Sequence, residues 1–185
     1  MMRLCLALSA LALSPLIVTS SADQVIIVLP TLFDLLTLER SGSIFFSYAR
    51  ETELSRLLTD DDSPSTLLIP TNRAIMALAR KPHQDPIPVD GGIDLNEQEL
   101  DQRSKRNVRH WVSLHIIPQS PIDIGLHSFP TLVEGRNVTF EEVEGDLSQP
   151  DWTRVLLNGE IRLLGKKEAR NGVFFLLDGT MKDGN

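Results

Sequence analysis

Cysteine is nearly absent from this sequence of 185 residues, which holds only Cys5. Cys5 lies in a leading segment, residues 1–22, that combines a basic start, an apolar run interrupted by proline, and small residues at Ser20 and Ala22. This pattern is typical of a cleaved signal peptide, and the apolar run is short for a membrane span. We therefore expect a secreted or lumenal chain of residues 23–185 that has no cysteine, and hence no disulfide and no thiolate metal site.

Positive charge and long apolar runs are also scarce. The chain has 18 Lys and Arg residues against 25 Asp and Glu residues, a formal net charge of -7. Nucleic acids and anionic membranes favour a basic face, so neither is an expected partner. No apolar run beyond the leading segment approaches the roughly 20 residues that cross a bilayer. The mature chain is therefore expected to have no integral membrane span.

Sequence signals for chemistry are missing as well. The sequence has no Gly-x-Ser-x-Gly nucleophile elbow and no glycine-rich phosphate loop between a strand and a helix. His110 and His115 are five residues apart, which places them on different faces of a helix, and no acid lies between them. Glu141 and Glu142 are neighbours on a predicted strand and so point to opposite faces. We expect no catalytic residue, no metal and no cofactor, and a hydrolase is only a remote alternative.

Apolar spacing predicts a helical first half. Residues 31–61 should form two or three short helices, followed by a polar turn and a short buried strand over Thr66–Ile69. A helix is expected over residues 74–79. The segment 80–106 carries many charges, three prolines and two adjacent glycines, and we interpret it as a charged loop insertion. A further helix, with Trp111 in the core, should cover residues 107–114.

The second half is predicted to be β-structure. Residues 134–137 join two strand-like runs, and Asn158-Gly159 joins two more, the latter pair being the strongest short signal for a hairpin. Asn171-Gly172 precedes a last apolar run that should be buried on both faces. Because helices come first and strands later, the sequence predicts one α+β domain.

One short stretch, residues 65–79, passes from strand to helix through three residues that interrupt the apolar run. Pro70 has no backbone N–H, so strand pairing is expected to end there. Thr71 or Asn72 is placed to accept hydrogen bonds from the free N–H groups of the following helix. These residues are therefore expected to turn the backbone and to carry no chemistry.

The order of these motifs resembles that of the fasciclin domain. Two conserved blocks and a central histidine of that family correspond to Thr66, Pro70, Thr71, Asn72, His115, Asn171, Gly172 and Asp178. Leu114 stands where the family often has tyrosine. The resemblance covers residues 31–181, and the long charged segment 80–106 is similar to an insertion in small, single-domain fungal members.

This resemblance implies a single fasciclin-like domain with a twisted β core and flanking short helices, in which the motif residues are structural. It also implies a non-catalytic role in cell adhesion or in cell wall or matrix protein–protein interaction. The partner would be a protein or a wall or matrix component, found outside the cell, in the wall or in the vacuole lumen. The alternative is a lumenal vacuolar or secretory-pathway binding protein with no adhesive role. Nothing in the sequence indicates the oligomeric state.

Two motifs are candidates for modification. Asn137-Val138-Thr139 is the one N-glycosylation sequon in the chain, and Asn137 is expected to be glycosylated on a eukaryotic secretory route. The run Arg103-Ser104-Lys105-Arg106 matches the pattern that dibasic processing proteases cut, here after Arg106. We favour the interpretation of this run as an exposed, charged start of a helix.

Overall fold

The computed structural model describes residues 29–84, 96–125 and 128–182, so the signal peptide expected at residues 1–22 lies outside the described residues. Four short helical segments open the described chain, namely α1 (Leu32–Leu38), η1 (Arg40–Gly42), α2 (Ser43–Arg50) and η2 (Glu53–Leu58). Thr31 and Asp34 form a capping box at the start of α1. The short helices predicted within residues 31–61 are confirmed.

Seven strands form one sheet in the order β2-β1-β7-β6-β5-β4-β3. Their bounds are β1 (Ser65–Pro70), β2 (Ile116–Ile117), β3 (Ser128–Pro130), β4 (Asn137–Glu142), β5 (Val155–Leu157), β6 (Ile161–Ala169) and β7 (Gly172–Leu177), and η3 (Asp151–Arg154) precedes β5. Strand β1 is parallel to β7, and the other neighbouring pairs are antiparallel. The predicted α+β class is confirmed.

Both predicted hairpins are present, and their turns differ in length. Asn158 and Gly159 have φ values of 50° and 69°, the left-handed conformation that suits the tight turn of residues 158–160 between β5 and β6. The loop between β3 and β4 is longer than the predicted turn at residues 134–137. It begins at Thr131, whose backbone N–H donates to the backbone oxygen of Arg136 at 2.8 Å.

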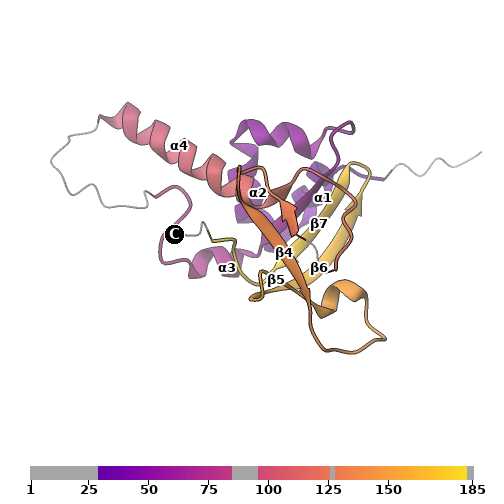
Figure 1. Ribbon diagram of the computed structural model, residues 1–185. Coiled ribbons are helices and arrows are strands. Elements are labelled where there is room, and N and C mark those ends of the chain that lie inside the picture. Colours follow the sequence, from indigo (N-terminus) through magenta and orange to yellow (C-terminus); the bar gives the residue numbers. More distant parts are fainter. Residues whose placement is uncertain (1–28, 85–95, 126–127, 183–185) are drawn as a thin grey trace, which may run out of the picture.

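Apolar side chains pack on both faces of β1 and β7. Leu67 and Phe174 belong to a cluster with the helices, whereas Leu68 and Phe175 belong to a second cluster with β3, β4, β5 and β6. In Figure 1, α1, α2 and α4 lie above β4, β5 and β6. Both phenylalanines are buried, so the prediction that the last run is buried on both faces is confirmed.

Two helices differ from their predicted bounds. Helix α3 (Asn72–Ala77) begins and ends two residues earlier than predicted. Helix α4 (Glu97–Leu114) begins ten residues earlier than predicted, so residues 97–106 are helix and the interpretation of the whole segment 80–106 as a loop is wrong. Its first turn is stabilised by a capping box between Asn96 and Glu99. Figure 1 shows the start of α4 projecting away from the sheet.

Candidate functional site

Strand β1 carries the first family block, and its residues serve the sheet. Thr66 is buried and donates its hydroxyl to the backbone oxygen of Gln119 at 2.8 Å. Pro70 lies opposite Leu177, and the backbone N–H of Thr71 donates to the oxygen of Leu177 at 3.0 Å. Pro70 is the last residue of β1 and the last that pairs with β7, as predicted, and the hydrogen bond from Thr71 lies one residue beyond it. Because alternate N–H groups of a strand point to opposite sides, the nitrogen of Pro70 faces away from β7.

Thr71 and Asn72 have different roles at the start of α3. The hydroxyl of Thr71 accepts the N–H of Ala74 at 3.3 Å and so caps the helix, as predicted. The side-chain oxygen of Asn72 instead accepts the N–H of Ile44 at 2.9 Å, in the first turn of α2. Its amide group donates to the backbone oxygen of Arg40 at 2.8 Å. Asn72 therefore joins two helices and does not cap its own.

Asn171 joins three elements from the turn between β6 and β7. It is fully buried, its oxygen accepts the N–H of Leu32 at 2.8 Å, and its amide group donates to the oxygen of Leu58 at 3.0 Å. Gly172 follows with φ of 152°, and a Cβ at this position would lie 2.0 Å from the backbone oxygen of Ser65. Only glycine permits this approach between β7 and β1.

His115 is fully buried and uses both ring nitrogens in hydrogen bonds to the backbone. Nε2 accepts the N–H of Met181 at 3.1 Å, and Nδ1 lies 2.8 Å from the oxygen of Trp111. Since Nε2 accepts, Nδ1 carries the hydrogen and donates to Trp111. Burial lowers the pKa of His115 to about 4, against the opposing effect of the hydrogen bond to Trp111. The ring is therefore neutral at pH 7 and links α4 to the segment that follows β7.

Asp178 completes the family motif at the end of the β6–β7 pair. Its carboxylate accepts the N–H of Arg162 at 2.7 Å, and its own N–H donates to the oxygen of Arg162 at 3.1 Å. The hydrogen bonds of these motif side chains are therefore made to other groups of the same domain. They position strands and helices, and the structure does not bring them together at one open site.

Metal ligation and membrane insertion have no support in the described residues. Within residues 29–84, 96–125 and 128–182, no three His, Cys, Asp or Glu side chains are close enough to hold a metal ion. In the same ranges, no helix combines the length and the apolar character needed to cross a membrane.

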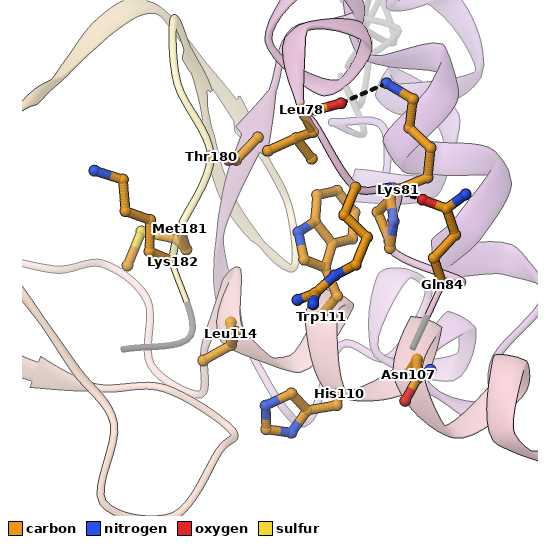
Figure 2. A pocket seen from close by; sticks show the side chains of 12 residues that line it. Leu78, Lys81, Gln84, Asn107, His110, Trp111, Leu114, Thr180, Met181 and Lys182 are labelled. Atoms are coloured by element: carbon orange, nitrogen blue, oxygen red, sulfur yellow. Dashed lines mark hydrogen bonds between the residues drawn. The ribbon is translucent and has the colours of Figure 1, made fainter. Parts of the chain in front are cut away.

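A cleft of about 290 Å³ lies between the turn after α3, the second half of α4 and the segment after β7. Figure 2 shows its side chains from these three segments around the indole of Trp111. The lining residues are Leu78, Arg80, Lys81, Pro82, Gln84, Asn107, His110, Trp111, Leu114, Thr180, Met181 and Lys182. Three of them are Lys or Arg, and none is Asp or Glu. Sequence reasoning missed this cleft because its three segments are far apart in the chain.

Two residues give the cleft its shape. The amino group of Lys81 donates to the backbone oxygens of Met76 at 2.8 Å and Leu78 at 2.9 Å and so closes the end of α3 (Figure 2). Trp111, expected in the core, is only half-buried: one part packs against the helical cluster and the residue also lines the cleft. Its ring centroid lies 4.5 Å from that of His115.

A larger cavity, of about 740 Å³, lies between α2, η2 and α4. Its lining mixes both signs of charge, with Glu53 and Asp101 on one hand and Lys105 and Arg109 on the other. Arg109 and Glu53 form an ion pair across it. This cavity therefore shows no preference for a ligand of either charge.

The two modification motifs lie in different surroundings. Asn137 is exposed at the start of β4, opposite Pro130. The processing motif Arg103–Arg106 lies within α4 and not at a helix start, because the helix begins at Glu97. Processing proteases bind extended substrates, so cleavage after Arg106 would require local unfolding of α4.

No protein-family model matches the chain. A FAS1 domain-containing protein of Aspergillus fumigatus is 30% identical over 146 residues, which is 73% of this chain and 62% of that protein. A FAS1 domain-containing protein of Neurospora crassa is 35% identical over 150 residues, 76% of this chain and 64% of that protein. The chain thus spans less than two thirds of either relative.

The fold is similar to that of a solved FAS1 domain pair from the insect cell adhesion molecule fasciclin I. The TM-score is 0.54 at 13% identity, over 83% of this chain and 51% of that one. At this identity the likeness concerns the fold alone. The fungal relatives and the fold together identify the chain as a fasciclin-like (FAS1) domain protein, as the sequence motifs predicted.

Proposed function

We propose that this chain is a non-catalytic secreted or vacuole-lumen protein that acts in cell adhesion or in cell wall or matrix protein–protein interaction. The observation that carries the proposal is the state of His115, the described group with a large pKa shift. Perturbed groups are often catalytic. His115, however, is enclosed in the core with both ring nitrogens bonded to the backbone, so it cannot reach a substrate. This structural role of His115 favours a function through contacts of the protein surface.

Three further features support an extracellular or lumenal contact role. The solved structure with a similar fold comes from an insect cell adhesion molecule. The leading segment 1–22 has the sequence pattern of a signal peptide. The sequon residue Asn137 is exposed at the start of β4, so its side chain is accessible to glycosylation.

Cell fractionation tests this proposal. An epitope-tagged full chain, expressed in a fungal host, is followed in the medium, in the cell wall and in the vacuole, and partners are captured from each fraction. We expect the chain in the medium or wall, together with a wall or matrix component. A chain confined to the vacuole would instead support the alternative, a lumenal binding protein without an adhesive role, and would exclude adhesion.

A further inference from the structure

The cleft around Trp111 is a positively charged site on a negatively charged protein. Over the whole chain, acidic residues outnumber basic ones and the formal net charge is -7. The cleft nevertheless gathers Arg80, Lys81 and Lys182, and none of its lining residues in the described part of the chain is Asp or Glu. An anion that approaches this protein is therefore repelled by the average charge and attracted only locally. This contrast indicates a site for an anionic group.

The three cations differ in their freedom to bind. Lys81 is held by backbone oxygens, which are neutral acceptors, so its full charge remains at the edge of the cleft. Lys182 forms an exposed ion pair with Glu160, of the kind that contributes little and exchanges readily. Arg80 is exposed and has no ion-pair partner among the described residues. The planar guanidinium group of Arg80 is therefore available for bidentate contact with a carboxylate or phosphate.

The rest of the lining suits a polar ring with one apolar face. Trp111, Leu78 and Met181 provide an aromatic and aliphatic surface, and Gln84 and Asn107 provide amide groups. The side-chain oxygen of Gln84 accepts the backbone N–H of Lys81 at 2.7 Å, which leaves its NH2 group to donate to a ligand. The volume of about 290 Å³ lies at the small end of the range for ligand pockets. It suits one ring and its substituents better than an extended chain.

We propose that this cleft binds an anionic sugar residue, with its acid group on Arg80 and Lys182, its hydroxyls on the two amides and its ring against Trp111. The acid can be the carboxylate of a hexuronate or the phosphate of a sugar phosphate, since both present oxygens to a guanidinium group. This inference rests on the proposed contact function and names the chemistry that one contact surface would recognise.

Fluorescence of Trp111 tests the site directly. The chain has two tryptophans, so Trp152→Phe leaves Trp111 as the only indole. This variant of the mature chain is titrated with glucuronate, glucose 6-phosphate, glucose and inorganic phosphate, with calorimetry as a second readout. We expect saturable binding of at least one acidic sugar, binding about tenfold or more weaker for glucose, and weakening with salt. The tighter of the two acids identifies the source of the charge.

Charge-matched variants test the assigned residues. Arg80→Gln with Lys182→Gln should weaken binding of the acidic sugar about tenfold or more, with unchanged thermal unfolding because both side chains are exposed. The control, Arg73→Gln with Lys105→Gln, removes two exposed cations outside the cleft and should leave affinity unchanged. Equal effects of the two double variants, or equal affinity for glucose and glucuronate, would overturn the proposal. So would equal affinity for inorganic phosphate and glucose 6-phosphate, since the site would then hold an ion only.

The outcome separates this inference from the proposed function. If the wild-type chain is retained in the wall fraction but binds no acidic sugar, the cleft assignment fails and the contact function stands. If the chain binds acidic sugar but is found only in the vacuole, the cleft assignment stands and the adhesive function fails.

Discussion

Acid should destabilise this domain through His115. The ring is neutral and buried, with a pKa of about 4 in the folded chain against 6.5 in its ordinary state. The unfolded chain therefore binds the extra proton more readily, and stability is complete above pH 6.5 and lost as the pH falls from 6.5 to 4. A difference of this size corresponds to about 3 kcal/mol in full, of which about 2 kcal/mol is lost between pH 7 and pH 5.

The structure also predicts where the damage begins. Protonation places a hydrogen on Nε2, which then faces the N–H of Met181 and can no longer accept it. Because this hydrogen bond holds Met181 against α4, the segment after β7 should loosen first. Met181 also lines the cleft. The protection factor of the Met181 amide, which corrects for the intrinsic pH dependence of hydrogen exchange, is therefore expected to fall at pH 5 before those of amides in β1 or β7 do.

Urea unfolding at pH 7, 6 and 5 measures the energetic part, with His115→Gln as the control. Glutamine keeps an acceptor near the position of Nε2 but does not titrate. The wild type should lose about 2 kcal/mol between pH 7 and 5, while the variant should be nearly flat over this window, which lies above the ordinary carboxyl range. A wild type that is equally stable at both pH values, or a variant with the same loss, would refute this reasoning.

Three further predictions concern single residues, each measured by chemical unfolding unless stated. Asn171→Ala should cost about 3 kcal/mol, because it leaves buried backbone groups of α1 and η2 without partners; a cost below about 1 kcal/mol would contradict this role. Gly172→Ala should cost about 3 kcal/mol or more, since its Cβ would meet backbone at 2.0 Å. Gly165→Ala, whose nearest contact is 3.5 Å, should cost far less. In protein secreted from a eukaryotic host, Asn137→Gln should remove the extra mass that a glycosidase takes off the wild type. An unchanged mass would show that the sequon is unused.

The parts of the fold that depend on local chemistry could be predicted from the sequence. Asn158-Gly159 specifies a hairpin through its own backbone preference, and the turn has the expected left-handed geometry. The start of α4 was missed because residues 97–107 hold one apolar residue, Leu100, so apolar periodicity gives no signal there. The sequence signal that could have located this start is the pair Asn96 and Glu99, a capping box three residues apart.

The parts that depend on distant contacts could not be predicted in the same way. Asn72 was one of the two residues expected to cap α3, but its side-chain oxygen accepts the N–H of Ile44, 28 residues earlier in the chain. The cleft is built from residues 78–84, 107–114 and 180–182, which only the folded chain brings together. Neither arrangement leaves a pattern in the local sequence, because the groups that meet are separated by whole strands and helices.

The central claim is that this FAS1 domain acts by contact and without catalysis. The most direct measurement is sedimentation of the purified mature chain with isolated fungal cell walls, together with analysis of the supernatant for released sugars and peptides. The account predicts that the chain sediments with the walls in a saturable manner and that no soluble product accumulates. A chain that stays in the supernatant, or a time-dependent release of products by the intact protein, would contradict it.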